Sequence, residues 1–114
     1  LAVYDRRVTE AEGALNRARE LRPGDASPLL NLGILYDEAR RPQEASSYLR
    51  QALARDPGYS AAWKLLGKSL EAGDRLEAAE AYRQGIIAAE SKGDKQAARE
   101  MRVFLARLER AGGR

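Results

Sequence analysis

Residues 29–36, LLNLGILY, and residues 63–70, WKLLGKSL, each place a glycine inside a run that otherwise predicts a helix. A helical glycine costs about 1 kcal/mol relative to alanine, so its presence in both runs needs a structural reason. Gly33 and Gly67 are 34 residues apart, and their neighbours recur at the same interval. This interval indicates an internal repeat, which determines the fold of any chain that contains one.

Other packing and chain-breaking residues recur at the same interval. The aligned pairs are Glu10 and Glu44, Ala11 and Ala45, Leu15 and Leu49, Ala18 and Ala52, Pro23 and Pro57, Leu29 and Trp63, and Leu32 and Leu66. Apolar residues at helical spacing predict helices over residues 26–39, 42–55, 60–72 and 75–91. Each unit of the repeat is therefore expected to contain two helices.

The ends of these helices carry recognisable residues. We expect Ser27 and Ser60 to be the N-caps of the first helix of each pair, and Pro42 to open a second helix. Asp56 precedes a proline and should end that helix, because a residue before proline avoids helical backbone angles.

Two glycine–aspartate pairs predict turns. We expect Gly73 to adopt the left-handed C-cap conformation and Asp74 to be the N-cap of the next helix, with Gly93 and Asp94 repeating the arrangement.

The two central glycines predict close contact between paired helices. Without side chains, Gly33 and Gly67 let the helices approach, and we expect the small residues Ala45 and Ala78 opposite them. A flexible hinge is the alternative, but the recurrence of the whole neighbourhood disfavours it.

These residues resemble the tetratricopeptide repeat. In residues 26–59 its pattern is carried by Leu29, Leu32, Gly33, Tyr36, Ala45, Leu49, Ala52 and Pro57. In residues 60–93 it is carried by Trp63, Leu66, Gly67, Leu70, Ala78, Tyr82 and Gly85, although this unit is one residue short and lacks the final proline. Residues 8–25 match the second half of a unit, and residues 1–7 are expected to be the tail of its first helix.

The resemblance implies an all-α fold, a right-handed superhelical stack of antiparallel helix pairs. The expected single domain, residues 1–114, divides into a partial repeat at 1–25, repeats at 26–59 and 60–93, and a capping helix at 94–111. The last segment also resembles the closing helix of small bacterial proteins of this type. Since the chain begins at Leu1 rather than Met, we expect it to be a fragment of a longer protein.

The closing helix is amphipathic. An apolar stripe of about 80° contains Ala97, Met101, Phe104, Leu105 and Leu108. A terminal helix of a repeat stack needs an apolar inner face and a polar outer face, so capping is the first interpretation. The alternative is a basic docking face, in which Lys95, Arg99 and Arg102 meet an acidic partner and Val103 adds an apolar contact.

Composition excludes several kinds of chemistry. The chain contains no cysteine and no histidine, which excludes disulfides, thiolate zinc sites and imidazole bases. The sequence shows no nucleotide-binding or calcium-binding motif, so we expect no cofactor and no enzymatic activity. The net charge is +3, but no aromatic residues are interleaved with the basic row of the closing helix, which disfavours nucleic acid. No apolar run is long enough to span a membrane.

The resemblance also implies a groove lined by the first helix of each unit. The expected groove residues are Ser27, Leu30, Asn31, Ile34, Asp37, Glu38, Ala61, Lys64, Lys68, Glu71 and Ala72. Lys64 and Lys68 lie one helical turn apart and could receive an acidic peptide or a C-terminal carboxylate. The alternative is that Lys68 pairs with Glu71 in solvent. In members of the family that bind chaperone tails, the positions of Leu30 and Ile34 would be polar. The apolar residues at these positions disfavour that kind of binding.

The expected function is a non-catalytic module that binds a peptide or protein partner in this groove. The alternative is a structural role, in which the incomplete first unit exposes apolar side chains and a second copy covers them to form a homodimer. The side chains expected at that surface are Leu15, Leu21, Leu30 and Ile34.

Overall fold

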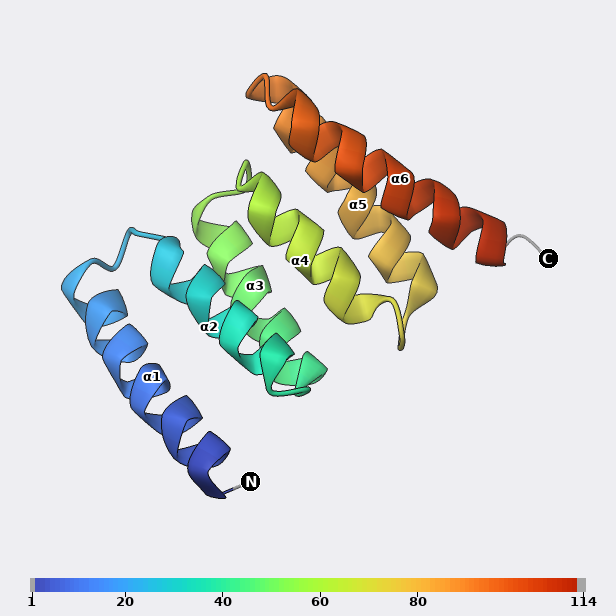
Figure 1. Ribbon diagram of the computed structural model, residues 1–114. Coiled ribbons are helices and arrows are strands. Elements are labelled where there is room, and N and C mark those ends of the chain that lie inside the picture. Colours follow the sequence, from blue (N-terminus) through green and yellow to red (C-terminus); the bar gives the residue numbers. More distant parts are fainter. Residues whose placement is uncertain (1, 113–114) are drawn as a thin grey trace.

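The computed structural model describes residues 2–112 and contains six helices and no strand within that range (Figure 1). In chain order they are α1 (Ala2–Leu21), α2 (Ser27–Glu38), α3 (Pro42–Arg55), α4 (Ser60–Leu70), α5 (Arg75–Ser91) and α6 (Lys95–Gly112). Most contacts join helices that follow one another in the sequence. The all-α stack of helix pairs is confirmed; the predictions for Leu1 and residues 113–114 lie outside the described residues.

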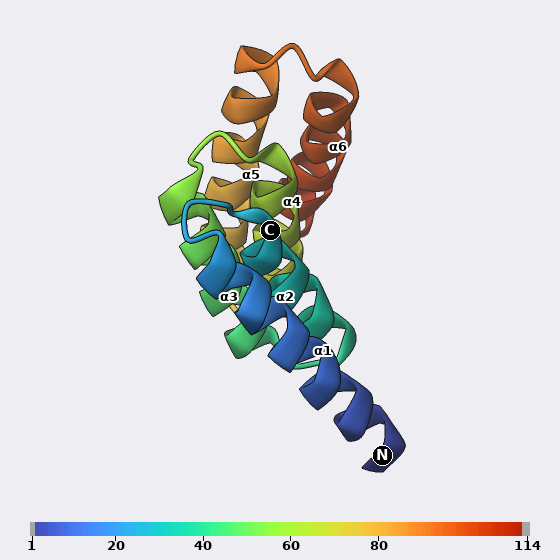
Figure 2. The ribbon, with the colours of Figure 1, turned by 90° about the vertical axis from the view of Figure 1, so that its left-hand side faces the viewer.

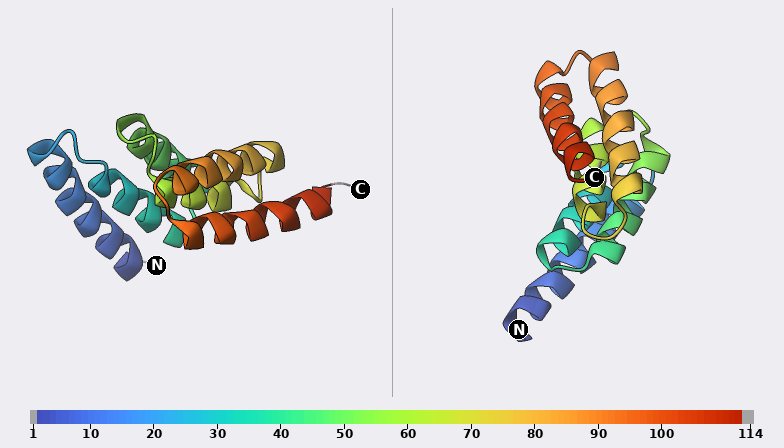
Figure 3. Two further views of the ribbon diagram at one scale, coloured as in Figure 1. Left: turned by 90° about the horizontal axis from the view of Figure 1, so that it is seen from above. Right: turned by 90° about the vertical axis from the view of Figure 1, so that its right-hand side faces the viewer.

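The helices form two layers. Viewed from the N-terminal end, α3 and α5 lie on one side, and α2, α4 and α6 lie on the other (Figure 2). Contacts between α2 and α4 and between α4 and α6 support this arrangement. Figure 3 shows α1 and α6 at opposite ends of the stack. Within residues 2–112, no helix combines the length and the apolar content needed to cross a bilayer.

The first helix differs from its prediction. Residues 2–21 form one continuous helix, so residues 2–7 are not the tail of a separate helix. No proline or turn sequence interrupts residues 2–12, and the helix therefore continues through the expected boundary. Val8 is buried against the core, and Leu15 packs beside it.

Both predicted serine caps are wrong. Neither Ser27 nor Ser60 makes a side-chain cap hydrogen bond, because each already lies inside the first turn of its helix. Instead, the backbone N–H of Ser27 donates to Oδ1 of Asp25 over 3.0 Å. That backbone hydrogen bond holds the pKa of Asp25 below its ordinary value, since it favours the charged carboxylate.

The helix ends set by proline and aspartate agree with the sequence. Helix α3 begins at Pro42 and ends before Asp56, as predicted. Asp74 is the N-cap of α5, and its Oδ1 accepts the backbone N–H of Glu77 over 3.0 Å. Oδ1 of Asp94 accepts the backbone N–H of Ala97 at the start of α6 over 3.1 Å.

The left-handed turn positions are partly wrong. Gly93 has the expected positive φ of 76°, but Gly73 does not, and the C-cap of α4 is Glu71 in a right-handed backbone conformation. Arg40 instead adopts a φ of 60° after α2. The N–H of Arg41 donates to the carbonyl of Tyr36, which closes the same C-terminal motif that Gly93 closes after α5.

The central glycines lie at the helix contacts, as predicted, but opposite larger residues. A Cβ built on Gly33 would lie 2.6 Å from Cδ2 of Leu49, and one on Gly67 would lie 2.5 Å from Cε1 of Tyr82. The carbonyl oxygen of Ala45 lies 3.4 Å from the Gly33 position, whereas the three atoms nearest the Gly67 position all belong to the Tyr82 ring. The missing side chain at each glycine therefore leaves room for a large buried side chain of the paired helix.

Two buried clusters form the core. One lies over α2 and α3 and includes the fully buried Leu29, Leu32 and Leu49. The other joins α5 to α6 through Tyr82 and Met101. Of the predicted α6 stripe, Met101 and Leu108 are buried and Ala97, Phe104 and Leu105 are half-buried, while buried Ala98 was not predicted.

Candidate functional site

The second layer presents a continuous surface made by α2, α4 and α6, which we term the α2/α4/α6 face. Ser69 of α4 donates a hydrogen bond from Oγ to Oδ1 of Asp37 on α2 over 3.5 Å. On the other side of α4, Nζ of Lys64 lies 3.3 Å from Oε1 of Glu100 on α6. These contacts join three helices that are far apart in the sequence.

An open depression of about 280 Å³ lies between α4 and α6 on this face. It is lined by Ser60, Ala61, Lys64, Asp94, Gln96, Ala97 and Glu100. The sequence assigns this groove to residues 27–38 and 61–72, so the contribution of α6 was missed. The repeat interval does contain a signal, because 34 residues after Lys64 the chain reaches the first turn of α6.

The predicted residues on α2 divide by exposure. Ser27, Asn31, Asp37 and Glu38 are exposed, whereas Leu30 and Ile34 are half-buried. Leu30 packs against the core, so only part of its side chain can meet a ligand. The exposed surface of α2 is therefore mainly polar.

The predicted residues on α4 already have partners. Lys64 is half-buried and paired with Glu100, and the ammonium of Lys68 lies 5.2 Å from the centre of the Phe104 ring. Glu71 does not pair with Lys68; it accepts a hydrogen bond from the hydroxyl of Tyr82. Lys64 and Lys68 therefore each contact a different residue of α6. The prediction that the two lysines receive an acidic ligand did not include these contacts.

Aromatic and cationic side chains meet where α4, α5 and α6 come together. The rings of Tyr82 and Phe104 have centroids 5.7 Å apart, and Cζ of Arg107 lies 5.4 Å from the Phe104 centroid. Burial raises the pKa of Tyr82 well above its ordinary value, and the hydrogen bond to Glu71 raises it further. Tyr82 is therefore a neutral donor that orients Glu71 at the end of α4.

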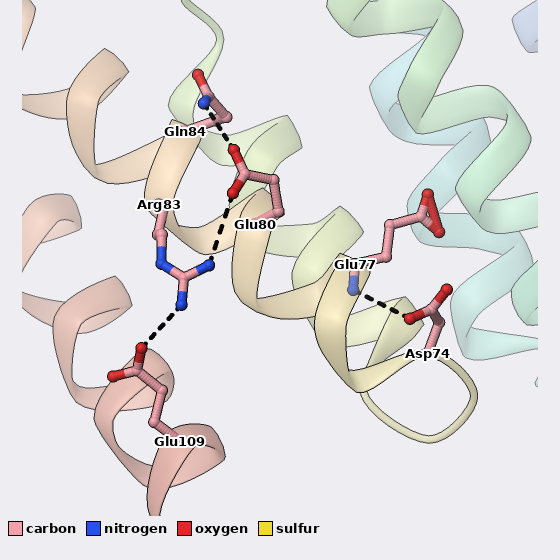
Figure 4. A network of polar contacts seen from close by, with 6 residues as sticks. All are labelled: Asp74, Glu77, Glu80, Arg83, Gln84 and Glu109. Atoms are coloured by element: carbon pink, nitrogen blue, oxygen red, sulfur yellow. Dashed lines mark hydrogen bonds and ion pairs between the residues drawn. The ribbon is translucent and has the colours of Figure 1, made fainter. Parts of the chain in front are cut away.

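The remaining carboxylates serve mainly in ion pairs and caps. Arg83 of α5 contacts both Glu80 and Glu109, and thereby ties α5 to α6 (Figure 4). Glu77 pairs with Arg50 of α3 at 2.8 Å. Among the described residues, no three metal-ligating side chains come together in a group that could hold a metal ion.

The predicted basic face lies at the outer surface of α6. Lys95, Arg99 and Arg102 are exposed and line a depression of about 450 Å³ with Glu90, Gly93 and Ala98. Arg102 forms an ion pair with Glu90 of α5. The face is continuous, but one of its three predicted cations is already neutralised.

The predicted self-association surface is smaller than expected. Leu21 is 82% exposed, but Leu15 and Leu30 are half-buried and pack against the core, and Ile34 is half-buried. The correction arises because α1 packs against α2, and Leu15 and Leu30 both pack against the core. A homodimer stays a prediction.

Comparison with known proteins agrees with this architecture. The sequence profile described as "Tetratricopeptide repeat" matches residues 2–68 and 38–102. These matches overlap, so the division into units at residues 26, 60 and 94 stays a prediction. The TPR repeat-containing protein PA0015 of Pseudomonas aeruginosa is 47% identical over 81 residues, which cover 70% of this chain and 77% of that protein.

Two solved structures resemble the chain over most of its length. The solution structure of protein BPP2914 from Bordetella parapertussis has a TM-score of 0.75 at 40% identity and covers 88% of each chain. The TPR domain of Sgt2 from Aspergillus fumigatus has a TM-score of 0.70 at 25% identity, over 96% of this chain and 75% of that one. With its glycine-centred helix pairs and these matches, the chain belongs to the tetratricopeptide repeat family.

Proposed function

We propose that this protein is a non-catalytic interaction module that binds a peptide segment of a partner protein along the α2/α4/α6 face. The observation that carries the proposal is the joining of α2, α4 and α6 into one surface by the Asp37–Ser69 and Lys64–Glu100 contacts. Such a surface offers side chains from three helices to one ligand. The family generally acts through protein–protein contacts, which supports this assignment.

Recognition on this face combines shape with a few charges. Asn31 and Lys68 are exposed and lie on different helices, so together they can fix the position of a bound segment. The depression beside Lys64 and Glu100 can take one side chain of that segment. Because the surface is open and polar, a single segment should bind with modest affinity.

The test is to select ligands from a random-peptide phage library and map each selected peptide by NMR on the labelled chain. Amide shifts are expected to change along α2, α4 and α6, at residues such as Asn31, Lys68 and Gln96. Shifts confined to the opposite layer, for example around Ser47 of α3, would contradict the proposal.

Variants sharpen the same test. Lys68→Glu with Asn31→Asp should weaken binding of the selected peptides, because it adds negative charge where the ligand lies. The matched control is Arg55→Glu with Ser47→Asp, which makes the same change in net charge at exposed positions of α3 in the opposite layer. Sedimentation at several protein concentrations separates peptide binding from the homodimer, since only self-association changes the measured mass on dilution.

A further inference from the structure

The outer surface of α6 carries a straight row of cations. Lys95, Arg99, Arg102 and Arg110 fall within about 80° of the helix circumference and span roughly 22 Å along its axis. All four side chains are exposed. Within residues 2–112, Lys95, Arg99 and Arg110 take part in no ion pair, while Arg102 pairs with Glu90. We term these four residues the α6 basic row.

The two acidic residues of α6 both pair with neighbouring helices, Glu109 from the edge of the row. Glu100 pairs with Lys64 of α4, and Glu109 pairs with Arg83 of α5. The helix therefore uses its own carboxylates to hold the stack together and leaves its outer surface positive. Like charges spaced three and four residues apart repel one another in a helix, so the basic row is locally unfavourable. An acidic ligand would remove that repulsion.

Apolar surface adjoins the row. Val103 is 57% exposed. Ala106 is exposed between Arg102 and Arg110. A ligand that follows the row can therefore bury a few small apolar groups as well as pair its charges.

We propose that the α6 basic row binds an acidic amphipathic helix of a partner protein, which lies alongside α6 with carboxylates at matching helical spacing. The charge complementarity and the straight row favour a helix as the occupant. A membrane surface is less suitable, because the apolar face of α6 is buried against the stack and cannot insert. The row also presents no aromatic ring for stacking on bases, since Phe104 packs against Tyr82.

The binding probe is a fluorescent helical peptide with glutamates at i, i+4, i+7 and i+15, the spacing of the four cations, and leucines on one flank of that stripe. Its control peptide has the same composition in an order that breaks the spacing. Fluorescence anisotropy at low ionic strength should show binding of the first peptide and clearly weaker binding of the second. Equal binding of both peptides would overturn the proposal.

Variants of the chain locate the site. Lys95→Glu with Arg99→Glu should weaken the peptide by about tenfold or more, because it reverses two charges of the row. Arg7→Glu with Arg17→Glu makes the same change in net charge on exposed positions of α1, and should alter affinity by less than about twofold. Far-UV circular dichroism checks that each variant keeps its helicity. Equal losses in the two double variants would overturn the proposal.

Two further measurements test the class of occupant and the independence of this surface. Lys68→Glu with Asn31→Asp should leave binding of the acidic peptide unchanged, which separates the α6 basic row from the α2/α4/α6 face. Duplex DNA and phosphatidylserine–phosphatidylcholine vesicles should bind more weakly than the peptide. Tighter binding of either, with the same dependence on Lys95 and Arg99, would show that the proposed occupant is wrong.

Discussion

The hydroxyl of Tyr82 donates a hydrogen bond to the carboxylate of Glu71, which ties a buried side chain of α5 to the residue that follows α4. The same ring fills the space that the missing side chain of Gly67 leaves open. One tyrosine therefore supports both the close contact between two paired helices and the end of the first of them.

Replacing Tyr82 by phenylalanine should keep the ring packing and remove the hydrogen bond to Glu71. We expect a loss of about 1–3 kcal/mol in the free energy of unfolding at neutral pH, since the acceptor is a carboxylate. Urea unfolding followed by circular dichroism measures this change. An unchanged midpoint would mean that a hydrogen bond from water to Glu71 stabilises the chain as well as the hydrogen bond from Tyr82 does.

Because the pKa of Tyr82 is raised in the folded chain, the stability of the fold should fall at alkaline pH. The folded state favours the neutral phenol, so its contribution to stability is present below the ordinary pKa of 10.0 and is lost as the pH rises above it. Alkaline titration should show one of the five tyrosines ionising later in the folded chain than in urea. The Tyr82→Phe variant should lack that late step, and its persistence would contradict the assignment.

Adding a methyl group at Gly67 should destabilise the chain. A Cβ there would lie 2.5 Å from the Tyr82 ring, so Gly67→Ala should cost about 1–3 kcal/mol by overpacking. Gly73→Ala is the matched control, because a Cβ at Gly73 meets no atom within 4 Å and φ is not positive there. Denaturant midpoints should move for Gly67→Ala alone; equal midpoints would refute the close contact.

Arg40 and Gly93 provide a reciprocal pair of predictions. Both adopt positive φ at the end of a helix, and that conformation costs a residue with a Cβ about 1 kcal/mol. Arg40→Gly should therefore stabilise the chain, and Gly93→Ala should destabilise it by a similar amount. Thermal unfolding of both variants checks the signs. If Arg40→Gly is less stable instead, the Arg40 side chain stabilises the fold by more than its positive φ destabilises it.

The sequence predicts the helices better than their ends. Pro42 and Asp56 determine the limits of α3 through local backbone geometry, which is readable from the residues themselves. The caps at Ser27 and Ser60 are each wrong by one residue, because the position of a cap depends on the path of the loop before it.

The partners across the stack are harder to predict. Gly67 faces Tyr82 rather than Ala78 because the register between α4 and α5 is set by packing over both helices. Lys64 meets Glu100 from 36 residues further along the chain, a contact that needs the curvature of the whole stack. The repeat therefore predicts which residues occupy the groove positions, but it does not predict which of their charges are paired.

The packing of each helix mainly against the helices before and after it bears on folding speed. Few distant segments must meet, so little chain entropy is lost before contacts form. Folding within microseconds to milliseconds is expected of such a topology. The central pairs, α2 with α3 and α4 with α5, are the natural places for folding to start, and the outer helices α1 and α6 can then add to them.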